Sequence, residues 1–171
     1  MVILQTGHPV LRAKSQPLTE REIASPKIQK LIKEMHKILS AAPDGVALAA
    51  PQIGKNVRIF VISEKAFASK TPETLKMNPR TYINPVIIRM STKKEVFDEG
   101  CLSVRNVFGK IKRASKVTVE AYDETGRKFR RGASGLLAEI FQHEIDHLDG
   151  ILFTDTATDL REVLPETKLH P

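Results

Sequence analysis

The segment that most constrains the fold is residues 134–149, which contains the sequence FQHEIDHL. Its apolar residues recur at the spacing of one face of an α-helix; they are Leu136, Leu137, Ile140, Phe141, Ile145 and Leu148. Gly150 follows directly, as is typical of a helix C-terminus. A helix with such a face is buried against other elements, so we predict a central helix in the C-terminal part of the chain.

A second helix is predicted near the N-terminus, over residues 25–41. Ser25 suits the N-cap and Pro26 the first helical position. A buried stripe at helical spacing follows, and His36 lies off that stripe, so we expect His36 to be solvated.

Short β-branched runs predict strands at 57–63, 81–90 and 116–123, with a turn at 123–126 and a hairpin arm at 127–131. Pro85 indicates that its strand is an edge strand or contains a bulge. Residues 63–80 lack periodicity and are expected to form a surface excursion. Together these elements predict an α+β fold, in which small mixed or antiparallel sheets pack around the central helix.

The length of 171 residues predicts a single domain over 1–171, with about 156–171 as a short tail. The sequence contains no apolar run of membrane-spanning length and no recognisable secretory signal. Cys101 is the only cysteine, which excludes an intrachain disulfide and fits a reducing compartment. We therefore expect a cytoplasmic protein without a membrane partner, although an organelle remains compatible.

The net charge of +7 suits an anionic neighbourhood such as a ribosome. The densest basic clusters are at 91–95, 109–113 and 126–131, and aromatic residues do not alternate with them. A stacking surface for bases would need such aromatics. Specific nucleic-acid binding is therefore not expected, and the charges can also serve solubility alone.

Two histidines in the central helix form the pattern HExxH. His143 and His147 are four residues apart, so they share one helix face, and Glu144 lies between them. The alternative is two ordinary surface or core histidines. Because the helix is amphipathic and buried, and because Glu144 stands where a general base of a metal site would, we favour a metal site.

A catalytic metal site needs a third protein ligand. Downstream of His147 there are acidic residues and His170 but no further histidine at the usual protease spacing, and a distal Glu stays open. Upstream, Cys101 stands in DEGCLSV (98–104) as the only thiol. It is a candidate ligand, and the alternative is a small buried apolar residue.

The stretch GVALAAPQIG (45–54) is rich in small residues, which allow a ligand to approach the backbone closely. The Gln52 amide could donate to a polarised carbonyl. Taken alone, the stretch could equally be a tight loop under a sheet.

Taken together and in this order, GVALAAPQ, EGCLS and QHEIDHLDG resemble the peptide deformylase family, the metalloenzymes that remove the N-formyl group from nascent polypeptides. HPVLR (8–12), INP (83–85) and GKIKR (109–113) are also similar to that family, so the resemblance covers residues 3 to about 155.

The resemblance implies that Cys101, His143 and His147 hold one divalent metal ion, with water in the fourth position. Fe²⁺ is the expected physiological ion, and Zn²⁺, Ni²⁺ or Co²⁺ are possible. Glu144 would act as general base and acid when that water attacks the formyl carbonyl. The Gln52 amide and the Leu102 N–H would stabilise the oxyanion.

The expected partners are N-formylmethionyl nascent peptides, with a transient ribosome contact. Gly45 and Val46 would bond the substrate backbone as an added strand. The positions expected to bind substrate are Gly45, Val46, Ala47, Glu99, Gly100, Phe108, Leu136, Glu139 and Ile140. Those expected to orient the metal ligands are Glu99, Arg113, Gln142 and Asp146.

Three positions depart from the family pattern. Ala47 stands where glycine is usual, Arg105 where proline is usual, and Glu139 where apolar or basic residues are usual. Ala47 and Glu139 leave room for a second function, a metallo-amidase or peptidase with another N-acyl specificity. A third, from a different class, is a non-catalytic basic module that binds the ribosome or RNA.

Overall fold

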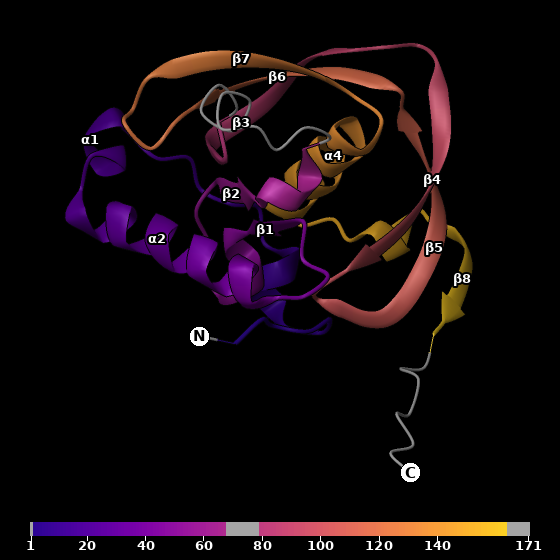
Figure 1. Ribbon diagram of the computed structural model, residues 1–171. Helices are drawn as coiled ribbons and strands as arrows, with labels where there is room; N and C mark the ends of the chain where they lie inside the picture. The colour runs from indigo at the N-terminus through magenta and orange to yellow at the C-terminus, as the bar shows by residue number, and fades with distance from the viewer. Residues whose placement is uncertain (1, 68–78, 164–171) are drawn as a thin grey trace.

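The computed structural model describes residues 2–67 and 79–163, which form two antiparallel sheets and two long helices (Figure 1). The larger sheet has the order β1-β2-β3-β6-β7. Its strands are β1 (Ala47–Ala49), β2 (Ile59–Ile62), β3 (Thr81–Met90), β6 (Lys116–Tyr122) and β7 (Lys128–Ser134). The smaller sheet has the order β4-β5-β8. Its strands are β4 (Lys94–Cys101), β5 (Val104–Ala114) and β8 (Thr158–Glu162).

The HExxH helix is α4 (Leu136–Leu148), and it lies in the middle of the molecule between the two sheets (Figure 1). Its apolar side chains Ile140, Phe141 and Ile145 are buried in the same cluster as residues of β1, β2, β3 and β6. The predicted α+β fold with antiparallel sheets is confirmed.

Gly150 lies two residues after the last residue of α4 and has a φ of +78°. A Cβ at this glycine would lie 2.6 Å from the backbone oxygen of Arg12. Glycine is therefore needed both for the left-handed backbone and for the close approach of the segment that contains η1 (Pro9–Arg12).

Helix α2 (Pro26–Ala41) covers the opposite face of the larger sheet. Ser25 Oγ accepts a hydrogen bond from the Ile28 N–H at 3.3 Å, so the predicted N-cap is present. Successive side chains of β2 pack on opposite faces of the sheet. Ile59 and Val61 are buried in the cluster that contains α2, whereas Phe60 and Ile62 are buried in the cluster that contains α4. This alternation is the period of two that a strand imposes. The sheet is buried on both faces here, which fixes α4 relative to β1.

The segment at Pro85 is a bulge and not an edge. β3 lies between β2 and β6, and its register shifts between Ile83 and Val86. Asn84 has a φ of +50° there, and the Arg58 Nε–H donates to the Pro85 carbonyl at 3.2 Å. The bulge removes Pro85 from the regular ladder, so the strand tolerates proline in the sheet interior.

His36 on α2 differs from its prediction as well. Its side chain is half-buried, and Nε2 lies 3.0 Å from Thr81 Oγ1 at the start of β3. The prediction of a solvated histidine is wrong because the larger sheet extends beyond the apolar stripe of α2 and covers part of the His36 side chain.

The smaller sheet was not predicted from the sequence. β4 and β5 form a hairpin that brings Cys101, the last residue of β4, beside Val104. β8 pairs with β5 within the segment that was predicted as a tail. Residues 68–78 of the predicted surface excursion and residues 164–171 of the tail lie outside the described residues.

Short helical turns complete the described chain. They are α1 (Glu20–Ile23), η2 (Ala50–Ile53), η3 (Glu64–Ala66) and η4 (Phe153–Asp155). The stretch 45–54 is thus partly strand, as β1, and partly a 3₁₀ turn, as η2, whereas propensity alone favoured a tight loop. Across residues 2–67 and 79–163, the helices are too short or too polar to cross a membrane.

Candidate functional site

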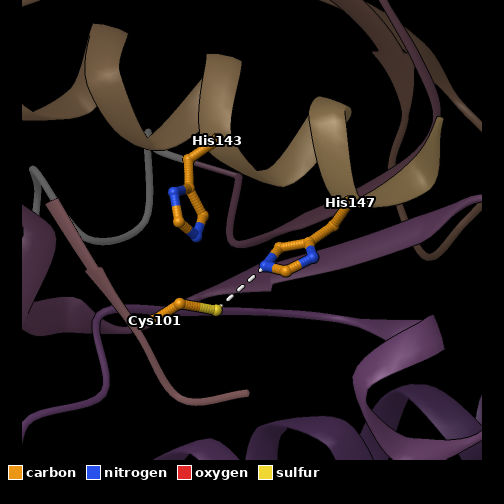
Figure 2. A group of neighbouring side chains, drawn as sticks. All are labelled: Cys101, His143 and His147. Carbon is orange, nitrogen blue, oxygen red and sulfur yellow. Dashed lines mark hydrogen bonds between the residues drawn. The ribbon is translucent and has the colours of Figure 1, made fainter. Parts of the chain in front are cut away.

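Three side chains that can bind a metal meet between α4 and the end of β4. His143 and His147 extend from one face of α4 toward Cys101 (Figure 2). One ligand atom from each residue lies within 4.8 Å of the other two, and the Cys101 Sγ is 3.1 Å from His147 Nε2. The helix period brings the two histidines together, and the β4–β5 hairpin supplies the thiol.

The ring of His143 is oriented by a buried carboxylate. Glu99, two residues before Cys101 on β4, is 1% exposed, and its Oε2 is 2.8 Å from His143 Nδ1. A hydrogen bond from Nδ1–H to this carboxylate leaves Nε2 as the ligand nitrogen, the usual arrangement around protein metal ions. The predicted role of Glu99 in orienting a ligand therefore fits the geometry.

Arg113 on β5 holds that carboxylate in place. Its Nε–H and Nη2–H donate to the two Glu99 oxygens at 2.7 and 2.9 Å, and Nη1–H donates to Asp146 Oδ2 at 2.5 Å. Arg113 is 7% exposed. One guanidinium therefore ties β4 and β5 to α4 directly behind the site.

Gln142 makes a second link from α4 to β5. Its Oε1 accepts the Ala114 N–H at 2.9 Å, and its Nε2–H donates to the Ala114 carbonyl at 3.0 Å. The Gln142 side chain thus hydrogen-bonds both the N–H and the carbonyl group of one β5 residue, as the backbone of a neighbouring strand would. It fixes the rotation of the helix, and with it the direction in which both histidines point.

The electrostatics of the cluster favour an anionic sulfur. Burial raises the pKa of the Cys101 thiol, but His147 and His143 outweigh burial and hold that pKa well below its ordinary value. A cysteine binds a metal as the thiolate. Thiolate and imidazole form a donor set that fits Zn²⁺, Fe²⁺ and related divalent ions.

Glu144 is the acid of this site. It is 4% exposed, and burial raises the pKa of its carboxyl group to about 7. Its Oε2 is buried and has no hydrogen-bond partner within the described part of the chain. A carboxyl group with a pKa near neutrality can both accept and return a proton.

The Gln52 side chain also lies beside the Cys101 thiol. Its Oε1 accepts the Ala49 N–H at 2.8 Å, and its Nε2 is 3.1 Å from Ser103 Oγ and 3.5 Å from Cys101 Sγ. The side chain is therefore fixed at both ends, with its amide beside the sulfur. The predictions did not include Ser103, and its only signal in the sequence is its position two residues after Cys101.

The cluster opens into a cavity of about 1100 Å³. Most of the predicted site residues line it: Gly45, Val46, Ala47, Gln52, Gly100, Cys101, Leu102, Phe108, Glu139, Ile140, His143 and Glu144. β1 is the first strand in the order of the larger sheet. Among the strands of residues 2–67 and 79–163 it pairs only with β2, and it directly follows Gly45 and Val46.

Two predicted substrate contacts are not in the lining, and one wall was missed. Leu136 is 48% exposed at the start of α4, and Glu99 is buried behind His143. Residues of α2, including Glu34, Lys37 and Ile38, do line the cavity. No local pattern marks them, because their role depends on where α2 packs.

The three departures from the family pattern all lie at the cavity. Ala47 is buried and is not among the described residues with positive φ, so its methyl group causes no backbone strain there. Arg105 is exposed and lies in the β5 strand next to Asn106, which has a φ of +62°. Glu139 is half-buried, one helical turn before His143.

Comparisons with known proteins agree on one family. A family model described as polypeptide deformylase matches residues 1–163. Peptide deformylase 2 of Clostridium acetobutylicum is 42% identical over 150 residues, which is 88% of this chain and 90% of the relative. Peptide deformylase 1A, chloroplastic/mitochondrial, of Arabidopsis thaliana is 43% identical over 161 residues, 90% of this chain. The chain spans only 60% of that relative's length.

Solved structures with the same fold carry similar names. The peptide deformylase of Thermotoga maritima aligns with a TM-score of 0.79 at 33% identity, covering 91% of this chain and 96% of that chain. A peptide deformylase from Synechococcus elongatus, solved in complex with actinonin, aligns with a TM-score of 0.78 at 36% identity. That alignment covers 92% of this chain and 78% of that chain.

Proposed function

Because the chain belongs to the polypeptide deformylase family, we propose that it removes the N-formyl group from the N-terminal methionine of nascent polypeptides. The observation that carries this proposal is the Cys101, His143 and His147 cluster, two members of which line a cavity of about 1100 Å³. The reaction is hydrolysis of a formamide, with formate and a free amine as products.

Cys101, His143 and His147 would hold the metal ion that this family requires, and Fe²⁺ is the proposed physiological ion. A divalent ion bound there supplies Lewis acidity, which lowers the pKa of water and polarises a carbonyl group. Thiolate and imidazole ligands also accept Zn²⁺, Ni²⁺ and Co²⁺. Which ion is bound therefore depends on the availability of each metal as much as on the protein ligands.

Glu144 moves the proton. Its pKa of about 7, raised by burial, lets the carboxylate accept a proton from the attacking water at neutral pH. The same group then returns the proton to the nitrogen of the leaving amine. A carboxyl with an ordinary pKa near 4.5 would return that proton too readily to solvent instead of holding it.

The formyl oxygen is stabilised by Gln52 and by the Leu102 backbone N–H. The Gln52 amide is fixed beside the Cys101 sulfur by its bonds to Ala49 and Ser103, so it needs no reorganisation when negative charge develops. The substrate backbone adds as a strand along Gly45 and Val46, beside the open side of β1. A transient ribosome contact and a cytoplasmic location stay predictions.

The test is formate release from formyl-Met-Ala-Ser by anaerobically prepared, Fe²⁺-loaded protein, with acetyl-Met-Ala-Ser as the competing acyl group. We expect rapid release of formate, little release of acetate, and a loss of about 10²- to 10⁴-fold in kcat for Glu144→Gln. Formate release equal in wild type and Glu144→Gln would refute the mechanism. Faster cleavage of the acetyl peptide would favour an amidase with another acyl specificity.

A further inference from the structure

Glu139 is a carboxyl group in the cavity wall that the proposed mechanism does not use. It lies four residues before His143 on α4, and both residues line the cavity. Residues at this spacing are neighbours on one helix face, with Cβ atoms about 5–6 Å apart. Glu139 therefore faces the part of the cavity one helical turn away from the metal ligands.

The Glu139 carboxylate has no cationic partner among the residues that the structure describes. None of the described hydrogen bonds or ion pairs includes it, and Arg113, whose charge acts on Glu139, is already bound to Glu99 and Asp146. Burial is the larger cause and the negative charge of Glu99 the second; together they raise the pKa of Glu139 to about 7. Carboxylates that leave water are normally paired, so this one lacks a counterion that a ligand could supply.

The reach of a substrate side chain decides which ligand group arrives there. When the formamide carbon lies beside the metal ligands, the first Cα is about 2.5 Å away, given ordinary C–N and N–Cα bonds. An unbranched side chain of four or five atoms extends roughly 5–6 Å further. That distance is about one helical turn, which is the separation of Glu139 from His143.

We propose that Glu139 determines specificity, and that the cavity accepts formyl peptides whose first side chain is unbranched and ends in a cation, such as ornithine or lysine, as well as methionine. This inference rests on the proposed function. Methionine remains a substrate because its thioether sulfur can accept a weak hydrogen bond from the neutral carboxyl group. Norleucine has the same shape as methionine but leaves that carboxyl group without a partner, which disfavours it.

The experiment measures kcat/KM for formyl-X-Ala-Ser, where X is methionine, norleucine, ornithine or lysine. Wild type is compared with Glu139→Leu and Glu139→Gln, all Fe²⁺-loaded. We expect the ratio of kcat/KM for the ornithine peptide to that for the norleucine peptide to fall at least about tenfold in Glu139→Leu. The ornithine cation loses its ionic contact, and the apolar norleucine side chain gains an apolar neighbour. Glu139→Gln should fall between, since its amide keeps a hydrogen-bond acceptor but no charge.

The matched control is Glu124→Gln, which removes one exposed carboxylate on the β6–β7 turn, outside the cavity. It should leave the ratio unchanged. An equal ratio in wild type and both Glu139 variants would overturn the inference while leaving formyl-Met hydrolysis, and so the proposed function, intact.

A binding measurement keeps the inference testable if turnover fails for every peptide. Calorimetry on Glu144→Gln protein, with and without Glu139→Leu, compares formyl-Orn-Ala-Ser with formyl-Nle-Ala-Ser. Preference for ornithine that depends on Glu139 supports the inference. A preference that is absent, or that survives Glu139→Leu, contradicts it.

Discussion

The metal ligands could be found from the sequence because each depends on local chemistry. His143 and His147 follow from the helix period, and Cys101 is the only thiol in the chain. Glu99 and Leu136, two of the expected substrate contacts, lie outside the cavity lining. Which way their side chains point depends on how α4 lies against β4, and no local spacing encodes that contact.

Removal of the thiol should remove the metal. Cys101→Ala leaves two histidines, too few for a stable site, so bound metal should fall from about one ion per chain to near zero. Elemental analysis of dialysed protein measures this. Ser103→Ala, two residues away, is the control and should retain the ion. Full metal occupancy in Cys101→Ala would mean that another residue is the third ligand.

Glu139 should make stability depend on pH. Its folded-state pKa of about 7 is above the ordinary 4.5, so the folded protein binds this proton more tightly than the unfolded chain. That contribution is complete below about pH 4.5 and is lost as the pH rises to about 7. Relative to wild type, metal-free Glu139→Gln should therefore gain stability between pH 5 and pH 8. Denaturant unfolding at both pH values measures the difference, and a constant difference would contradict the raised pKa.

At the scale of elements, the two long helices and strands β2, β3, β6 and β7 followed their sequence patterns, whereas β1 and the smaller sheet did not. Burial along β4 alternates regularly, but the residue types do not follow it, because Val96 is 62% exposed and Glu99 is buried. Because a glutamate faces inward and a valine faces outward, the sequence of β4 lacks the alternation of apolar and polar residues that predicts a half-buried strand. The site explains the exception, since Glu99 is buried in order to reach His143 and Arg113.

The Glu99–Arg113–Asp146 network should be a major link between the hairpin and α4. Arg113→Met removes a buried cation and leaves the Glu99 carboxylate without its main partner, which costs about 3–5 kcal/mol for a buried pair. The free energy of unfolding measures this loss.

The control for this prediction is Arg130→Met, which breaks the Glu120 pair on the exposed face of β7. It should cost less than about 1 kcal/mol. Equal costs for the two variants would show that the buried network does not hold the elements together.

At the scale of the molecule, the cavity is the property that the sequence could not provide. Its walls come from α2, β1, the β4–β5 hairpin and α4, which are brought together only by the packing of the two sheets. The sequence predicted which short stretches carry the chemistry, but α2 as a wall and β8 beside β5 depend on contacts between distant segments. These contacts have no local signature.

The central claim is that one metal ion at Cys101, His143 and His147 supports formamide hydrolysis. The most direct measurement is an anaerobic titration of metal-free protein with Fe²⁺, with formate release from formyl-Met-Ala-Ser recorded at each step. We expect the rate to rise linearly and to reach its plateau at about one ion per chain, as for a single site with three protein ligands. A rate that does not depend on the bound metal, or that needs a second equivalent, would contradict the account.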